Sequence, residues 1–478
     1  MGMGALAPVV ILVTTAVVIA VGGAGRASGT RFASAGLAWL GVFVSAMACL
    51  RIWGYRLRAL EWVDSDAFSL FLSLLVLVVL LLAVPVAKES LARQQRDGPA
   101  FYALLLLSAA GMLLLVSSRH LAVIFVALEM ISVGAYALTG WARDRNTSLE
   151  ASLKYFFYGT TASAFFLYGI ALFYVVAGSA DLAKIEAALL TILTGGDGVG
   201  PLPLVALGLL LVGLVYKIGA VPFHMWAPDV YEGAPTVVTG FMAVAVKTAA
   251  LGALLRVTGT LFSLTDEWRA VLWILAVLSM TIGNVMAVVQ DDIRRLLAYS
   301  GVAHAGYLLV GVIAGGVAGR SAVLFYLLGY SFMTFGAFAV AVALGRRGEE
   351  NLSVRGWGGL GWKYPLQGVA MSLFMLSLAG IPTTVGFVGK FYVFSAAISE
   401  GYVGLVLVAA VNTVVSAYYY LRVIMVLYMG APVPSPELDR LGLKLRIPLL
   451  VASVATVGLG ILPGPAIALA RRAALELF

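Results

Sequence analysis

Long apolar runs alternate with short polar segments along almost the whole chain. A helix needs about 20 mainly apolar residues to cross the ~30 Å hydrocarbon core of a bilayer. Fourteen runs come close to that length or exceed it, near residues 5–24, 33–50, 67–87, 100–117, 121–140, 152–177, 201–226, 236–258, 270–289, 297–318, 321–344, 364–399, 403–429 and 447–469. The pattern predicts an all-α polytopic membrane protein of about fourteen transmembrane helices, with little chain left for a domain outside the membrane.

Two of these runs are interrupted by glycine and proline close to a lysine. The run 201–226 is interrupted at 218–222, directly after Lys217, and the run 364–399 at 380–386, shortly before Lys390. Proline removes a backbone donor and glycine permits a turn, so we expect both helices to break there. Paired interrupted helices, one in each half of the chain, are typical of inverted-repeat transporters whose ion site lies at the breaks.

The composition supports the membrane interpretation. Hydrophobic residues make up 62% of the 478-residue chain and charged residues 11%, whereas an average soluble domain has roughly 45–50% and ~25%. This composition does not fit a soluble enzyme, and the net charge of +8 does not indicate a nucleic-acid partner. Because the first basic residue is Arg26, the N-terminal run lacks the basic region of a cleavable signal peptide and is predicted to be the first helix.

Chemistry that depends on cysteine or on clustered histidine is not expected. Cys49 is the one cysteine, so neither a disulfide nor a cysteine-ligated zinc or iron–sulfur site can form within the chain. The three histidines, His120, His224 and His304, match no metal-ligand spacing. We therefore expect no cofactor in this chain.

Lysine and arginine in the connecting segments are distributed unequally between the two sides of the membrane. One side collects sixteen, in 26–31, 88–96, 143–145, 294–295, 346–363 and 440–446. The other collects ten, in 51–58, Arg119, Lys184, Arg256, Arg269, Arg320 and 471–472. The positive-inside rule then predicts that both termini lie outside.

A few ionisable residues remain inside the predicted spans, where a charge costs roughly 2.5–3.5 kcal/mol on insertion scales. Glu129 is the one carboxylate expected in the middle of a span, and Lys217, Lys247 and Lys390 also lie well inside. Lys154 and Arg422 lie nearer to helix ends, where extension of the side chain to the membrane surface is the alternative.

These residue types suit proton transfer. A buried lysine beside a carboxylate can gain or lose a proton near neutral pH when the distance between them changes, which makes Glu129 with Lys217 the leading hypothesis. His224 and His304 are candidate relay residues, with a packing role as the alternative for both. Further polar neighbours that could hold relay waters are Thr248, Ser300, Tyr307 and Tyr392. His120 is expected at the membrane surface. Asp229 and Glu232 are expected in a loop, where they cap or hold the backbone.

The stretch 217–236 reads Lys-Ile-Gly-Ala-Val-Pro-Phe-His-Met-Trp-Ala-Pro-Asp-Val-Tyr-Glu-Gly-Ala-Pro-Thr. It closely resembles the antiporter-like membrane subunits of proton-pumping NADH–quinone oxidoreductase (respiratory complex I), a family that includes the Mrp-type cation/proton antiporter subunits. Further matches are 294–300 with His304, and 380–382 leading to 389–391. The resemblance covers nearly the whole chain, and the residues at 226–236 are similar to the N-type rather than the L- or M-type subunits. Val237 and Thr383 stand where the family often has proline.

The resemblance implies fourteen helices with two inverted five-helix repeats and breaks in helices 7 and 12. Helices 1–3 would occupy 1–99, the repeats 100–258 and 259–429, and the last helix 430–478. It implies that Glu129 modulates Lys217, that Lys247 links two half-channels and that Lys390 lies on the exit side. Lys154 would lie beside the first of these sites.

The resemblance also implies partners and a location. We expect a multi-pass subunit of the cell inner (plasma) membrane that translocates protons without a redox centre of its own. Its neighbours would be subunits M, K and J and the lateral helix of L, and partner subunits would hold FMN, iron–sulfur clusters and quinone.

Two other functions stay open on the sequence. The same charges could serve a subunit of a stand-alone Mrp-type Na⁺/H⁺ antiporter, without redox coupling. A scaffold subunit could use them only to bind helices together. A metabolite transporter is disfavoured, because no substrate-sized set of polar residues surrounds the breaks.

Overall fold

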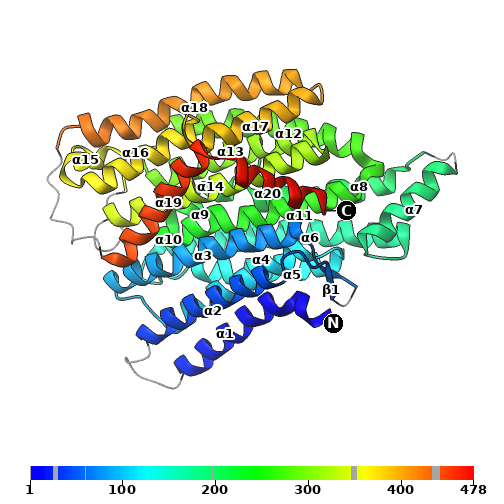
Figure 1. Cartoon of the computed structure of the whole chain (residues 1–478), viewed down its shortest axis with the longest axis horizontal. Helices are drawn as coiled ribbons and strands as arrows, with labels where there is room; N and C mark the ends of the chain where they lie inside the picture. The colour runs from blue at the N-terminus through cyan, green and yellow to red at the C-terminus, as the bar shows by residue number, and fades with distance from the viewer. Residues whose placement is uncertain are drawn as a thin grey trace.

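The computed structural model describes residues 2–24, 31–59, 61–195, 198–345, 352–432 and 442–477. Arg26, Arg346, Arg347 and Arg440, which entered the predicted charge distribution, lie outside the described residues. Most helices run side by side along one common direction, with α1 at one edge of the bundle and α18 at the other (Figure 1).

The secondary structure is almost entirely helical over the described residues. The first half contains η1 (Gly2–Leu6), α1 (Ala7–Ala24), α2 (Arg31–Arg51), β1 (Leu57–Ala59), β2 (Val63–Ser65), α3 (Ala67–Arg93), α4 (Pro99–Ser117), α5 (Leu121–Thr139), α6 (Asn146–Ala177), α7 (Leu182–Thr194), α8 (Pro201–Ile218) and α9 (Trp226–Gly233). The second contains α10 (Thr236–Phe241), η2 (Met242–Val246), α11 (Lys247–Thr260), η3 (Phe262–Leu264), α12 (Thr265–Val288), α13 (Ile293–Ala314), α14 (Gly316–Leu344), η4 (Arg355–Trp357), α15 (Leu360–Lys363), α16 (Pro365–Ala379), α17 (Val385–Ser399), α18 (Val403–Met429), α19 (Leu443–Ile461) and α20 (Gly464–Leu475).

The number of membrane spans agrees with the prediction. Within the described ranges, thirteen helical segments are long and apolar enough to cross a membrane. Two shorter apolar helices, α16 and α17, divide the run 364–399, as expected from its glycine and proline. Counted as one broken span, they complete the predicted set of fourteen. The all-α polytopic fold is therefore confirmed.

Several details of the helices differ from the prediction. The run 201–226 does break after Ile218, but the chain then forms a second helix, α9, beyond the predicted end of the span. The run 447–469 is not one helix, because α19 ends at Ile461 and α20 begins at Gly464, on either side of Pro463. The surface helix α7 was not predicted.

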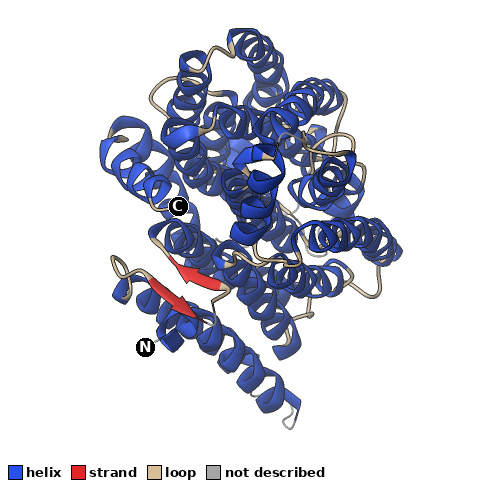
Figure 2. Ribbon diagram, turned by 90° about the vertical axis from the view of Figure 1, so that its right-hand side faces the viewer, coloured by secondary structure: helices blue, strands red, loops and turns tan. Residues whose placement is uncertain are grey.

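Both termini lie at the same end of the bundle, here called the terminal end (Figure 1). Its strands β1 and β2 pair antiparallel, and they face the viewer in Figure 2. The carboxylate of Glu476 near the C-terminus accepts a hydrogen bond from the backbone N–H of Ala67 (3.0 Å), at the start of α3. The predicted placement of both termini on one side is consistent with this arrangement, whereas which side is outside stays a prediction.

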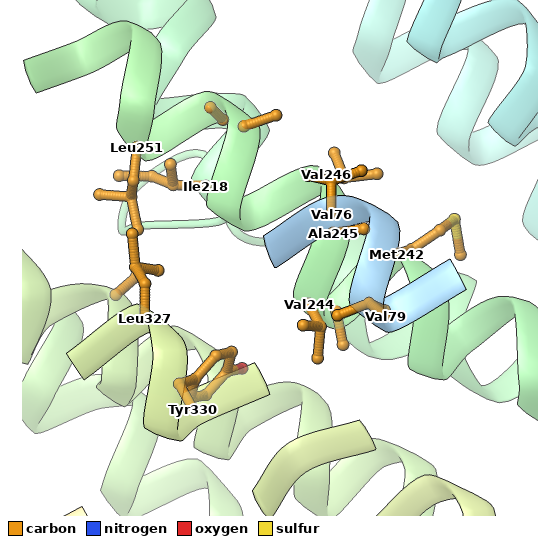
Figure 3. Packing of buried hydrophobic residues seen from close by; sticks show 14 of the residues in the cluster. Val76, Val79, Ile218, Met242, Val244, Ala245, Val246, Leu251, Leu327 and Tyr330 are labelled. Atoms are coloured by element: carbon orange, nitrogen blue, oxygen red, sulfur yellow. The ribbon is translucent and has the colours of Figure 1, made fainter. Parts of the chain in front are cut away.

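The helices at the centre of the bundle are buried along their length. The spans Thr236–Thr260 and Ile293–Ala314 are the most completely covered, and α14 follows them. Within the first of these, Met242–Val246 forms a π-helical turn directly before Lys247, an irregularity that the apolar pattern did not predict. Figure 3 shows this turn packed beside Val76 and Val79 of α3, with Tyr330 of α14 nearby.

A buried ion pair joins three helices at the terminal end. Arg256 is 0% exposed, and its guanidinium binds both carboxylate oxygens of Asp66 at 3.1 Å and the carbonyl oxygen of Val116. This corrects the prediction that Arg256 lies in a loop, because α11 continues to Thr260. Asp66 also caps α3 by accepting from Ser69 N (2.7 Å), so one carboxylate satisfies both a helix N-terminus and the arginine.

A second, more exposed cluster lies beside this pair. Asp64 accepts hydrogen bonds from Arg58 (2.8 Å) and Arg119 (2.9 Å). Burial alone would raise the pKa of Asp64, but the hydrogen bond from Arg58 and the charge of Arg119 outweigh it and hold the pKa below its ordinary value. The segment before α3 is thus fixed to α4 and α5 by charge.

We expect Arg256→Met to lower the thermal stability of the protein strongly. The variant leaves Asp66 buried without its partner, which costs about 3–5 kcal/mol in buried pairs. The measurement is the unfolding temperature of the purified protein in detergent. The control is Arg58→Met, because the Arg58 side chain is 58% exposed and Asp64 keeps Arg119, so its effect should stay within about 1 kcal/mol. Equal unfolding temperatures for the two variants would contradict the assignment.

Candidate functional site

Lys217 lies at the end of α8 in a pocket formed with α5 and α6. Its Nζ donates to Ser132 Oγ (2.8 Å) and lies 5.4 Å from the ring centre of Tyr155. The rings of Tyr136 and Tyr216 are each 5.9 Å from the same nitrogen. A buried ammonium is tolerated only when protein groups replace its water, and here a hydroxyl and three aromatic rings do so.

Glu129 lies near this pocket on α5 without touching the lysine. Its carboxylate accepts a hydrogen bond from Ser163 of α6. Glu129 and Lys217, both in the described part of the chain, do not form an ion pair in this structure, and the hypothesis that their separation changes stays a prediction. Ser132, which binds Lys217, and Ser163, which binds Glu129, line one small cavity together with Lys217.

The first helix break arranges the aromatic groups around Lys217. Gly219 ends α8 with φ +71°, a backbone conformation that glycine adopts without strain. Trp226, at the start of α9, donates from Nε1 to the carbonyl of Tyr216 (3.2 Å) and stacks on Tyr155 at 4.6 Å between ring centres. His224 is half-buried within the break, and its buried Nδ1 has no partner among the described residues.

Lys247 follows the π-helical turn and points at α13. Its Nζ donates to the carbonyl oxygen of Gly301 and lies 5.5 Å from the ring centre of Tyr330. A Cβ on residue 301 would come within 3.1 Å of that nitrogen, so glycine is the residue that leaves room for the lysine. The π-helical turn ends directly before this lysine, and such turns are frequent at functional sites.

Lys390 binds the broken end of the helix that precedes it. Its Nζ donates to the carbonyl oxygens of Leu378 (3.0 Å) and Ala379 (3.2 Å), the last residues of α16. The end of a helix leaves such carbonyls without internal partners and carries partial negative charge, which suits an ammonium. The ring of Tyr307 lies 4.8 Å from the same nitrogen. Thr383 adopts φ +75° in the break, so the chain turns there without the second proline often found in the family.

His304 lies on α13 between the aromatic partners of these two lysines. Its ring centre is 5.2 Å from that of Tyr330 and 5.7 Å from that of Tyr307. Nδ1 hydrogen-bonds with the hydroxyl of Tyr326 (2.6 Å), and Nε2 with that of Tyr420 (3.1 Å). The structure therefore places His304 beside tyrosines that contact Lys247 and Lys390, and its role as a relay residue stays a prediction.

Lys154 belongs to a different cluster, at the end of the bundle opposite the termini. Its Nζ binds Asp229 (2.7 Å) and Glu150 (2.8 Å), and Asp229 also binds Arg295 (2.8 Å). Arg295 reaches Glu232 as well (2.7 Å). Asp229 and Glu232 lie on α9 rather than in a loop, which corrects their predicted role. Lys154 does not contact Lys217. The next residue on α6, Tyr155, does contribute one of the three aromatic rings around Lys217.

The prediction named Tyr307 as a polar neighbour but missed the other tyrosines that surround the charged residues. Each buried lysine lies within 6 Å of at least one tyrosine ring, and His304 is hydrogen-bonded to two tyrosine hydroxyls. In a scan for apolar runs, tyrosine counts as hydrophobic and gives no signal. The spacing of Tyr326 and Tyr330, four residues apart on one helix face, is the one sequence feature that could have indicated the site. The described residues contain no cluster of three His, Cys, Asp or Glu that could hold a metal ion.

Comparison with known proteins agrees with the predicted resemblance. The family model described as NADH:quinone oxidoreductase/Mrp antiporter, TM, matches residues 118–416. The chain is 41% identical to the NADH-quinone oxidoreductase subunit N of Trichlorobacter lovleyi over 442 residues, 91% of this chain and 90% of the relative. It is 37% identical to that of Chloroflexus aggregans over 486 residues, 99% of this chain and 97% of the relative.

Solved structures agree on the fold. A chain of respiratory complex I from Thermus thermophilus with bound aureothin superposes with a TM-score of 0.83 at 37% identity, covering 96% of this chain and 98% of that one. A chain of the Mrp complex from Dietzia sp. superposes with a TM-score of 0.87 over 100% of this chain and 98% of that one. At 23% identity, the second likeness concerns the fold alone.

We expect Ser132→Ala to destabilise the protein by about 1–3 kcal/mol, because it removes the one hydroxyl that accepts from the buried Lys217 ammonium. The measurement is again the unfolding temperature in detergent. Thr161→Val on the exposed face of α6 is the matched control, since that hydroxyl bonds only to Phe157 O of its own helix. If Ser132→Ala unfolded at the same temperature as Thr161→Val, that result would contradict the role assigned to Ser132.

Proposed function

Because this chain belongs to the NADH:quinone oxidoreductase/Mrp antiporter family of membrane subunits, we propose that it works as the proton-translocating N-type subunit of an NADH–quinone oxidoreductase. Electrons would pass through other subunits, and this chain would move protons without a redox centre of its own. The observation that carries the proposal is the series of buried charges, Lys217, Lys247 and Lys390, each held by an oxygen and an aromatic ring.

In this proposal Glu129 and Lys217 form the switch. When Glu129 lies toward Lys217, its negative charge stabilises the ammonium; when Glu129 lies away, the ammonium loses that support and passes its proton on. The hydrogen bond from Ser163 holds Glu129 on the side of α6, which corresponds to the separated state of the switch. A change in a neighbouring subunit would drive the exchange between the two states.

The later steps run along the centre of the bundle. The proton would move to Lys247, cross by way of His304 and reach Lys390, from which it leaves to the outside. His304 is suited to the middle position because its two ring nitrogens face different hydroxyls, so it can accept a proton on one side and release one on the other. His224 and Lys154 would act nearer the entrance, at the first break and at the Asp229 cluster.

The proposal includes partners and a place in the cell. We propose that the chain adjoins subunits M, K and J and the lateral helix of L in the inner (plasma) membrane, with both termini outside. FMN, iron–sulfur clusters and quinone would be held by partner subunits. The alternative, a subunit of a stand-alone Na⁺/H⁺ antiporter, draws support from the fold shared with the Mrp complex, and a purified complex without flavin and iron–sulfur subunits would favour it.

We expect Lys217→Ala and Glu129→Ala each to lower proton translocation driven by NADH oxidation several-fold, because each removes one half of the switch. The measurement is acidification of inverted vesicles that contain the assembled complex. The control is Lys184→Ala, which removes an exposed lysine of α7. Wild-type proton translocation by both variants in a fully assembled complex would refute the mechanism.

A scaffold role is separated from proton transfer by Lys390→Met, which keeps much of the side-chain volume and removes the charge. We expect the complex to assemble with normal subunit content and to translocate protons several-fold more slowly, because the exit station is lost. Quantification of subunits after purification accompanies the vesicle assay. Failed assembly, with normal proton translocation in the complexes that do form, would instead support the scaffold function.

A further inference from the structure

Asn284 on α12 is a fully buried amide that the proton route described above does not use. Its Nδ2 donates to the hydroxyl of Tyr307 on α13 (3.3 Å), and its Oδ1 accepts from the hydroxyl of Tyr419 on α18 (2.9 Å). Nδ2 also donates to the backbone carbonyl of Asn412 on α18 (3.0 Å). Burying an amide is costly unless it is hydrogen-bonded, and this one is satisfied by groups from two other helices.

The two tyrosines lead to different members of the proton route. The ring of Tyr307 is the aromatic surface against the ammonium of Lys390, 4.8 Å away. The ring of Tyr419 packs on that of Tyr420, with 4.3 Å between their centres, and the Tyr420 hydroxyl is the partner of His304 Nε2. The Asn284 amide therefore holds the Tyr307 ring that faces Lys390. Through Tyr419, whose ring packs on Tyr420, it also supports the hydroxyl that hydrogen-bonds to His304.

An amide is suited to this position for a specific chemical reason. The backbone carbonyl of Asn412 can only accept from Asn284, whereas the hydroxyl of Tyr419 donates to it, so the side chain between them must offer both a donor and an acceptor. A carboxylate of the same shape can only accept, and leucine can do neither. Asn412 supports the arrangement from α18, where its Nδ2 reaches Thr281 at the exposed edge of α12 (3.3 Å).

We infer that Asn284 is a positioning residue for the transfer of protons between His304 and Lys390. It keeps the Tyr307 ring against the Lys390 ammonium and the Tyr420 hydroxyl on His304. The inference rests on the proposed proton route. Because the face of an aromatic ring attracts a cation, a loosened Tyr307 supports the charged lysine less, and the step that needs protonated Lys390 then fails at a lower pH.

The test replaces Asn284 with leucine in the complete complex and measures the protons translocated per NADH oxidised as a function of pH. We expect a lower ratio at neutral pH and a shift of the alkaline limb of the profile to lower pH by about half a unit, the size that one weakened cation–π contact produces. A residue that only stabilised the fold would reduce the amount of complex and leave the ratio and the profile unchanged.

Tyr307→Phe is the second variant, because it keeps the ring and removes the hydroxyl that Asn284 holds. We expect the same shift of the profile, and we expect the double variant to shift no further than either single one, since both break the same contact. Thr281→Val is the matched control. It removes only the outermost hydrogen bond of the network and should retain the wild-type ratio and profile.

Lys390→Ala is measured alongside, so that the two ideas can fail separately. A wild-type ratio in Lys390→Ala would overturn the proposed function. A lowered ratio in Lys390→Ala together with wild-type ratios and profiles in Asn284→Leu and Tyr307→Phe would overturn the inference alone. If Asn284→Leu does not assemble, Tyr307→Phe decides the question by itself.

Discussion

The arrangement at the centre of the bundle depends on how the ammonium group of a lysine is solvated where no bulk water is present. A lysine inside the bilayer loses its hydration shell, and protein groups must replace it or the charge is lost. The three central lysines solve this in the same way, each with an oxygen on one side and an aromatic ring on another. The oxygen and ring partners are Ser132 with Tyr155 for Lys217, Gly301 with Tyr330 for Lys247, and Leu378 with Tyr307 for Lys390. None of the three ammonium groups forms an ion pair with a carboxylate among the described residues, which is what the proposed proton transfer requires of them.

The irregular parts of the helices exist at the places where this support is needed. The end of a helix leaves carbonyl groups without partners inside the helix, so a break can offer them to a lysine. The break after α16 exposes two carbonyls to Lys390, the break after α8 brings Trp226 against Tyr155, and the π-helical turn sets the direction of Lys247. By contrast, the ends of the bundle are held by full ion pairs, such as Arg256 with Asp66 and Arg295 with Asp229. Fixed charge therefore stays at the ends, and loosely held charge occupies the middle.

The residues of the candidate site could be predicted where the neighbouring sequence alone marks them. The lysines and Glu129 are charges in apolar runs, and the breaks are glycine and proline beside them, so both features are visible locally. The errors arose where a partner is distant in the chain. Arg256 looked like a loop residue because its carboxylate partner lies 190 positions away. No distance between Glu129 and Lys217 follows from the sequence, and in the structure each hydrogen-bonds to a serine instead, Glu129 to Ser163 and Lys217 to Ser132. Asn284, Tyr419 and Tyr420 gave no signal, because their role depends on contacts among α12, α13 and α18.

The sequence by itself therefore determined the membrane-spanning helices, the broken runs and which charged residues lie inside the spans, since burial in a bilayer makes length, hydropathy and isolated charge informative without any partner. Only the tertiary structure decided what each charge touches. Hydrogen bonds and aromatic contacts act over a few ångströms, and the helices that supply them meet only when the whole bundle is packed. Whether Lys154 belongs with Lys217 or with Asp229, and whether His304 lies between two lysines, follows from that packing.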